Sequence, residues 1–411
     1  MQFRFEELEH SPGVVLAGVT KSGISNDRAR KPFRTRMKVL HVVESLDHGS
    51  VETWLVRMLR HARNRGIDLD WSFYCTLGRP GVKDDEVRAL GAHVIHSPAP
   101  MREKLAFVRA LREELRQKEY EVLHCHHDLV SAVYLVAALG MPVTKRVIHV
   151  HNADEVVPTP NRFKQSILRP LLRRGCLWMA DSVVGNSNHS LDTFIGDRVR
   201  RKGVDVVNYL GVDSTPFESA KGDRFEFRRS LGIAEHSWIL LFAGRMVPEK
   251  NPVFAVDVLA ELVRFDPGAI GVFAGSGMLE SAVRQRSEQL GLGDAVRYLG
   301  WRSDVADIMC CCDWFILPHP EQPVEGFGIA VVEAQLAGLR MLLSRGILDD
   351  PLLPTACFRR LSLADGPIAW AEAAMELRRE PAPSRATAVA ALRQSPMDMD
   401  RALERLLQLY A

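Results

Sequence analysis

Two cations follow a short apolar segment near the middle of the chain. Residues 239–243 are predicted to form a buried strand, and Gly244, Arg245 and Lys250 come directly after it. Arginine offers a planar, permanently charged fork that matches phosphate oxygens, and lysine adds a flexible point charge. A strand, a glycine and two cations before a helix are therefore typical of a diphosphate site. The alternative interpretation is a charged turn with no ligand.

A second candidate is the segment Glu325-Gly-Phe-Gly-Ile-Ala-Val-Val-Glu333, which follows a predicted strand over 314–317. Phe327, Gly328 and Ile329 are expected to open a helix whose first backbone N–H groups can bind a phosphate. Glu325 in the loop and Glu333 in the helix can accept hydrogen bonds from sugar and ribose hydroxyls. Taken alone, both glutamates are also explained by the helix dipole and by solvent.

Further polar segments follow other predicted strands. Gly275 and Gly277 come after residues 269–274, but position 280 is Glu, so the spacing of a dinucleotide-binding loop is incomplete. In the first half, Gly49, Ser50 and Glu52 open a predicted helix. His149 and His151 end a predicted strand, and Ser187 follows the next one. His124, His126 and His127 end another.

The elements that must position these residues alternate between strand and helix. From Met37 onward, short apolar runs alternate with helical patterns, and the pattern restarts near residue 239. This alternation predicts an α/β protein with two parallel sheets, each covered by helices. Ligands bind such sheets beyond the carboxyl ends of their strands, where every motif above falls.

We expect four parts: an extension over 1–36, a first domain over 37–215, a second over 216–395, and a C-terminal amphipathic helix over 396–411 that crosses back to the first domain. The link between the domains is expected over 213–223. The extension is interpreted either as a disordered basic tail or as a segment preceding a true start at Met37.

Composition limits the classes of protein. The chain has 411 residues, 46% hydrophobic and 25% charged, which excludes a disordered or collagen-like chain. The net charge of +2 argues against a dedicated nucleic-acid binder, yet residues 1–215 carry +7 and residues 216–411 carry −5. Seven cysteines without a disulfide spacing indicate reduced thiols in a cytoplasmic protein. No apolar run reaches the length of a membrane span.

Taken together, these motifs resemble the retaining glycosyltransferases of family 4, which have the GT-B fold, and especially the bacterial exopolysaccharide-type group 1 members. The resemblance covers nearly all of residues 37–390. It implies that Glu325 and Glu333 form the family's Glu-x7-Glu motif, with contacts to the donor sugar and the ribose. It also implies that Arg245 and Lys250 neutralise the donor diphosphate. The implied donor site further includes Gly244, Gly275, Gly277, Arg302 and the backbone of Phe327, Gly328 and Ile329.

On the acceptor side, the resemblance implies that Gly49, Ser50, Glu52 and Ser187 line the cleft, with a histidine near the anomeric carbon. His151 is the first choice for this histidine and His149 the second. The sequence departs from the family at three places. Ser50 replaces a glycine, Leu210 replaces an asparagine, and the segment beginning at Gly346 lacks the usual Gly-x-Pro-Glu.

The implied activity is transfer of a sugar from a nucleotide-diphosphate sugar, UDP- or GDP-linked, to a glycan or a polyprenyl-linked acceptor. A sugar-nucleotide epimerase, a phosphorylase and a catalytically silent binding protein are the alternatives. No cofactor is expected. The histidines are interpreted as core or acceptor-lining residues rather than as a metal site. A basic segment over 162–174, with apolar residues between its cations, suggests contact with an anionic membrane, on its inner face.

Overall fold

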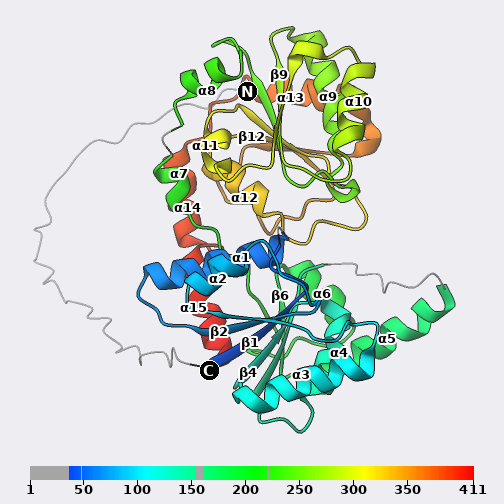
Figure 1. Cartoon of the computed structure of the whole chain (residues 1–411). Helices are drawn as coiled ribbons and strands as arrows, with labels where there is room; N and C mark the ends of the chain where they lie inside the picture. Colours follow the sequence, from blue (N-terminus) through cyan, green and yellow to red (C-terminus); the bar gives the residue numbers. More distant parts are fainter. Residues whose placement is uncertain (1–36, 48, 153–161, 221) are drawn as a thin grey trace, which may run out of the picture. The chain divides into compact units, whose positions relative to one another are not determined.

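Seven parallel strands form the first sheet of the computed structural model, in the order β3-β2-β1-β4-β5-β6-β7 (Figure 1). The structure describes residues 37–47, 49–152, 162–220 and 222–411, with the backbone alone for 162–165, so the expected extension over 1–36 lies outside the described residues. The strands are β1 (Lys38–Val43), β2 (Asp70–Cys75), β3 (His93–His96), β4 (Val122–Cys125), β5 (Lys145–Val150), β6 (Ser182–Gly185) and β7 (Val206–Val207).

Helices connect these strands as the alternating pattern predicts. They are α1 (Ser50–Asn64), α2 (Asp84–Ala89), α3 (Lys104–Lys118), α4 (Ser131–Ala138), α5 (Arg162–Met179) and α6 (Asn188–Ile195). On α1, the buried residues Leu55, Met58, Leu59 and Ala62 repeat at helical spacing, so one face of the helix is buried. The sequence analysis did not predict α6.

The second sheet has six parallel strands in the order β10-β9-β8-β11-β12-β13. They are β8 (Ile239–Ala243), β9 (Ile270–Ala274), β10 (Val296–Gly300), β11 (Trp314–Leu317), β12 (Arg340–Ser344) and β13 (Phe358–Leu361). Its helices include α9 (Pro252–Phe265), α10 (Glu280–Gln289), α11 (Val305–Cys310), α12 (Ile329–Leu336) and α13 (Gly366–Leu377). The α/β fold with two parallel, Rossmann-like sheets is thus confirmed, although β13 and α13 were not predicted.

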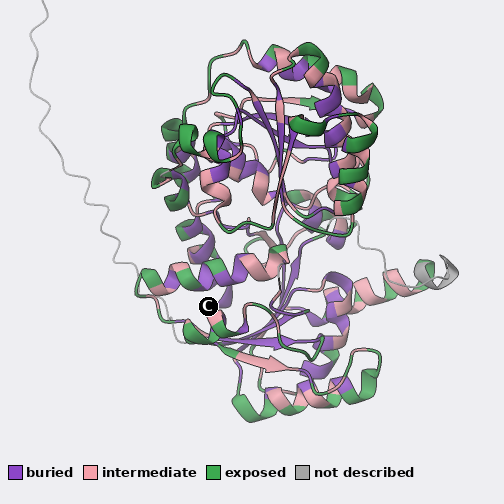
Figure 2. Cartoon of the chain, turned by 45° about the horizontal axis from the view of Figure 1, so that its top comes forward, coloured by how far each residue is buried: buried purple, intermediate pink, exposed green. Residues whose placement is uncertain are grey.

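Each sheet has its own apolar core. One cluster contains Leu40, Leu123 and Ile148 from neighbouring strands of the first sheet, and another contains Leu240, Phe273 and Trp314 from the second. Figure 2 shows that the central strands are buried while the outer faces of the helices are exposed. Apolar side chains therefore fill most of both sheets, although His41, His124 and His149 are buried polar residues within strands of the first sheet.

The segment expected to link the domains contains the short helix α7 (Thr215–Glu218), and Asp223 then caps α8 (Arg224–Ser230). After the second sheet, α14 (Arg385–Gln394) and α15 (Met399–Tyr410) complete the chain. The α15 helix contacts α1, and the Tyr410 hydroxyl lies 2.6 Å from Nδ1 of His124 in β4. The C-terminal helix therefore lies against the first sheet.

Candidate active site

The carboxyl ends of β8 and β9 bring two glycine-containing loops together. Gly244 follows β8, and the amide of Gly244 donates to the carbonyl of Ala274 at 3.0 Å. Gly275 has a φ of 146°, and a Cβ there would lie 1.9 Å from the Gly244 carbonyl oxygen. Only glycine fits this close approach. By contrast, no atom lies within 4 Å of a Cβ built on Gly244, so this position faces open space.

Lys250 and Glu325 form an ion pair at this edge of the sheet. Lys250 ends the short turn after Gly244, and Glu325 lies in the loop between β11 and α12. His319 also faces Glu325, with Nε2 at 3.7 Å from Oε2. Burial opposes ionisation of Glu325, but Lys250, His319 and Arg245 outweigh it and hold the pKa of this carboxyl below its usual value. Glu325 is therefore an anion held by cations.

Arg245 is the exposed cation of the site. Its side chain has no ion pair or hydrogen bond to any residue in the described part of the chain. Its charge nevertheless acts on two carboxyls, because it lowers the pKa of both Glu325 and Glu52. A free guanidinium within electrostatic reach of loops from both sheets is suited to bind an anionic ligand there.

The N-terminus of α12 offers backbone donors beside the same pair. Gly328 caps the helix with a φ of 75°, and no side chain accepts a hydrogen bond from the first turn. A helix start without a side-chain cap keeps its first amide groups available for an anion such as phosphate. The Phe327 side chain is buried at 2% exposure, and its ring centroid lies 5.6 Å from that of Tyr209. The loop is thereby fixed by packing.

Glu333 lies in α12, two residues beyond the first turn, and accepts a hydrogen bond from Arg57 of α1 at 2.8 Å. The Glu333 side chain is 14% exposed and that of Arg57 is 44% exposed. Glu333, the carboxylate expected to bind a ribose, is thus paired with an arginine of α1 in the first domain. A ribose can bind Glu333 only if this pair opens or shares the carboxylate.

His151 lies just beyond β5, and its backbone is held from three sides. Its amide donates to Oδ1 of Asp128 at 2.8 Å, and its carbonyl accepts from Nδ2 of Asn186 at 2.9 Å. A Cβ on Gly326 would lie 2.2 Å from the same carbonyl oxygen. The His151 backbone therefore packs against the residue that follows Glu325. Burial lowers the pKa of the His151 imidazole to about 3, so the ring is neutral at physiological pH.

Glu52 lies in the first turn of α1, beside Gly49. A Cβ on Gly49 would lie 1.9 Å from Oε2 of Glu52, so the carboxyl group occupies the space that a side chain at position 49 would fill. Burial raises the pKa of Glu52 to about 7, and the nearby carboxylates of Glu44 and Asp47 add to this effect while Arg245 opposes it. Glu52 can therefore bind or release a proton near neutral pH.

The remaining predicted residues have other surroundings. His149 is fully buried within β5, where its ring stacks 4.3 Å from that of His151, so His151 and not His149 is the histidine at the Gly326 loop.

The other predicted residues have structural contacts or lie at the surface. Ser187 is buried and caps α6 by accepting a hydrogen bond from the Ser190 amide at 3.1 Å, so its presence is explained by the structure of the helix. Ser50 is the exposed first residue of α1. Arg302 pairs with Asp304 beyond β10, and Gly277 packs against Met246.

Several residues that the sequence analysis missed complete the site: Arg57, Asp128, Asn186 and His319. His319 and Asn186 each follow the end of a strand, so the rule that ligands bind at strand ends could have found both. Asp128, three residues beyond β4, carries the same signal, whereas Arg57 lies within α1 and carries none, because its contact comes from the way the two helices meet.

A cavity of about 450 Å³ lies elsewhere, at the amino edge of the first sheet. Its lining includes Lys38, Asp70, Arg88 and Glu114. None of the predicted site residues borders it. Since parallel sheets bind their ligands at the carboxyl edge, we place the candidate active site at Arg245, Lys250, Glu325 and His151 instead.

Two protein-family models match successive parts of the chain. The family described as "Glycosyltransferase Family 4" matches residues 51–215, and the family described as "Glycosyl transferases group 1" matches residues 223–347. The two matches follow one another along the chain and together span most of it. The first match contains the helix that begins beside Gly49, and the second contains Arg245, Lys250, Glu325 and Glu333.

Relatives and solved structures give the same class. EpsF of Bacillus subtilis, named as a glycosyltransferase, is 25% identical over 383 residues, covering 92% of this chain and 97% of its own. The UDP-Gal:alpha-D-GlcNAc-diphosphoundecaprenol alpha-1,3-galactosyltransferase of Escherichia coli is 24% identical over 276 residues, covering 64% and 67%. The structure of Anabaena HepE in complex with UDP has a TM-score of 0.71 at 21% identity, covering 90% of this chain and 98% of that one.

Two parallel, Rossmann-like sheets, together with the family matches and the likeness to solved structures over 90% of the chain, define a GT-B glycosyltransferase. The chain belongs to the group 1 and family 4 glycosyltransferases, and it is a transferase enzyme.

Proposed function

We propose that this enzyme is a retaining glycosyltransferase that moves a sugar from a UDP-linked donor to a glycan or polyprenyl-linked acceptor, in the synthesis of an exopolysaccharide or another cell-surface polysaccharide. The single observation that carries the proposal is that two cations, Arg245 and Lys250, follow the carboxyl end of β8. Arg245 is unpaired among the described residues, while Lys250 is held beside Glu325. The UDP bound to the similar Anabaena protein supports the choice of base.

The proposed donor site uses charge that exists before the substrate arrives. We place the diphosphate between Arg245, Lys250 and the first amides of α12, next to Gly244, where no atom lies within 4 Å of a Cβ built on this residue. As the bond between sugar and diphosphate breaks, negative charge grows on the leaving phosphate. Fixed cations and backbone donors stabilise that charge. Glu325, held as an anion by Lys250, would accept hydrogen bonds from the donor sugar.

Retention is proposed to proceed by attack of the acceptor on the same face from which the diphosphate leaves. In that route the leaving phosphate takes the acceptor proton, so no carboxylate nucleophile is required, in contrast to glycosidases. The ion pair of Glu325 with Lys250 supports this route, because it makes the carboxylate a weaker nucleophile. Neutral His151 would contribute contacts to the sugar rather than a charge.

The test is a donor screen on purified protein. We expect release of nucleotide from one UDP-sugar, with proton NMR showing that the anomeric configuration of the product is that of the donor. Arg245→Ala should lower turnover by about a hundredfold, whereas Arg264→Ala, an exposed arginine of α9, should not. Binding of UDP without turnover of any UDP-, GDP- or ADP-sugar would instead favour a silent binding protein. An inverted product would contradict retention.

The acceptor side is proposed to contact an anionic membrane through α5. Ile167, Leu171 and Trp178 are 56%, 63% and 79% exposed, and with exposed Arg174 they repeat at helical spacing along one side of the helix. An apolar stripe that includes an arginine and a tryptophan is typical of a helix lying in a membrane interface. None of the described helices is long and apolar enough to cross a bilayer. The Escherichia coli relative is named for a diphosphoundecaprenol acceptor, which supports a lipid-linked substrate here.

Vesicle flotation tests this part separately. Wild-type protein should float with anionic vesicles at low salt and not with neutral ones. Leu171→Ser combined with Trp178→Ser should abolish flotation, whereas Ile368→Ser, which changes an exposed residue of α13, should not. Equal flotation of both variants would contradict the proposed membrane contact of α5 and would leave the proposal for the donor site unchanged.

A further inference from the structure

Five histidines lie on one face of the first sheet, and all are buried. His41 lies in β1, His124 in β4 and His149 in β5, while His126 and His151 directly follow β4 and β5. His41 pairs in register with His124, and residues two apart in a strand point to the same face. Their exposed fractions are 0% for three of them, 4% for His126 and 7% for His151. Such a group is unusual, because each buried imidazole nitrogen needs a partner.

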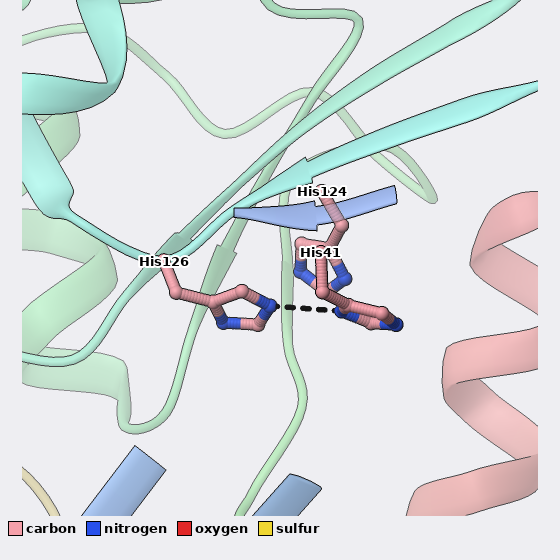
Figure 3. A group of neighbouring side chains, drawn as sticks. All are labelled: His41, His124 and His126. Carbon is pink, nitrogen blue, oxygen red and sulfur yellow. Dashed lines mark hydrogen bonds between the residues drawn. The ribbon is translucent and has the colours of Figure 1, made fainter. Parts of the chain in front are cut away.

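Three of these rings converge in a geometry that suits a metal ion (Figure 3). One nitrogen from each of His41, His124 and His126 lies within 4.8 Å of the other two. Nδ1 of His41 is 3.1 Å from Nε2 of His126, and the ring centroids of His41 lie 5.1 Å and 5.3 Å from those of His124 and His126. Three imidazoles around one ion place their ligating nitrogens about 3.3 Å apart if each bond is about 2.0–2.1 Å long.

The outer nitrogens of two rings already have the hydrogen bonds that metal-binding histidines make. Nδ1 of His124 lies 2.6 Å from the Tyr410 hydroxyl, and Nδ1 of His126 lies 3.0 Å from Nε2 of His151. When Nδ1 carries the proton and donates outward, Nε2 presents its lone pair inward. A histidine ligand typically fixes its tautomer through such a partner on its second nitrogen.

The inner atoms have few partners. Nε2 of His124 is buried and has no hydrogen-bond partner in the described part of the structure, while Nδ1 of His41 and Nε2 of His126 face each other. The second nitrogen of His41, Nε2, is also buried without a partner among the described residues.

We propose that His41, His124 and His126 bind a transition-metal ion that prefers imidazole nitrogen, such as Zn²⁺. The cluster consists of histidine alone, so Mg²⁺ and Ca²⁺, which need oxygen ligands, do not fit. Because Tyr410 belongs to α15, the ion would connect the C-terminal helix to β1 and β4. The three ligands are not residues of the candidate active site, although Nδ1 of His126 lies 3.0 Å from Nε2 of His151, and we assign the ion a structural role.

The experiment uses the full chain without a tag. After chelation and removal of the chelator, the protein is titrated with Zn²⁺ by calorimetry, and bound zinc is measured by elemental analysis. We expect about one equivalent and a rise in the melting temperature of about 5 °C. Co²⁺ should give the intense visible absorption of a four-coordinate ion with nitrogen ligands.

Variants decide which residues bind the ion. His124→Gln and His126→Gln should each lower affinity at least a hundredfold, and exposed His236→Gln should not. Tyr410→Phe keeps the ring packing and removes the hydroxyl, so it should weaken binding about 10–100-fold while the protein stays folded. Wild-type protein that binds no zinc, or that shows only the weak spectrum of six-coordinate Co²⁺, would overturn the proposal. Equal affinity of wild type and Tyr410→Phe would overturn the role given to α15.

Discussion

The two sheets have the same parallel architecture, but the side chains at their carboxyl edges differ in charge. At the edge of the second sheet, Lys250 and Glu325 are charged and paired, and Arg245 is exposed. At the edge of the first sheet, burial keeps the imidazoles of His126 and His151 neutral, and their neighbours include the carboxylate of Asp128 and the amide of Asn186. A ligand that carries two phosphates finds permanent cations at one edge and none among these histidines. The difference indicates that binding chemistry depends on the loops and on burial, and not on the sheet topology that the two halves share.

The largest effect is expected from removing a cation at the charged edge. Lys250→Ala deletes the partner of Glu325 and one of the two charges that we propose to bind the donor phosphates, so kcat/KM should fall by about a hundred- to a thousandfold. Lys202→Ala, an exposed lysine of the first domain, is the matched control. Steady-state kinetics with the donor found in the screen measure both. A loss of less than threefold would mean that Lys250 does not face the diphosphate.

A smaller effect is expected at Glu52 of the first domain, where burial raises the pKa of the carboxyl group. The pKa of Glu52 is about 7 in the folded chain, against 4.5 as its ordinary value. Between these values the folded state binds more protons, so Glu52 lowers stability as pH rises through the window and has a constant effect above it. Glu52→Gln should remove this dependence, worth at most about 3 kcal/mol. Chemical denaturation of both proteins from pH 4.5 to 8 measures the difference.

If Glu52 faces the acceptor, catalytic activity should depend on pH over the same range. In that case, the pH profile of wild-type kcat/KM should bend near pH 7, and the Glu52→Gln profile should not. Identical stability profiles for the two proteins would contradict the raised pKa, whatever the activity shows.

Substitutions at two glycines at the carboxyl edge of the second sheet distinguish an effect on packing from an effect on ligand binding. Gly275→Ala should lower the free energy of unfolding by about 1–3 kcal/mol, because its Cβ would overlap the Gly244 carbonyl in a strained backbone conformation. Gly244→Ala meets no atom of the chain, so stability should change by less than about 0.5 kcal/mol. If the diphosphate occupies that space, the KM for the donor should still rise about tenfold. An unchanged KM would place the phosphates elsewhere.

The smallest effect is expected at the contact of Arg57 with Glu333. The arginine is 44% exposed, so losing the pair should cost less than about 1 kcal/mol of stability. Arg57→Ala frees the carboxylate, and UDP should bind about two- to fivefold more tightly by calorimetry. Weaker binding would show that Arg57 itself contacts the nucleotide.

The site could be predicted where residue type and strand position coincide. Arg245, Lys250 and Glu325 each follow an apolar run that a parallel sheet requires, so their common edge follows from topology alone. His319 could have been found by the same rule. Asp128, which lies three residues beyond β4, could have been found in the same way. Arg57 could not, because it meets Glu333 276 positions away in sequence. No local pattern encodes such pairs.

By itself, the sequence determined the alternation of strands and helices, because apolar periodicity and strand-end glycines are local properties of the chain. It also determined which cations and carboxylates are available to a phosphate and a sugar. Only the tertiary structure decided which of them are paired, exposed or neutral. It made His151 and not His149 the histidine beside Gly326, and it gathered His41, His124 and His126 with Tyr410. The physical reason is that charge state and ligand geometry depend on burial and on neighbours from distant parts of the chain, which only folding brings together.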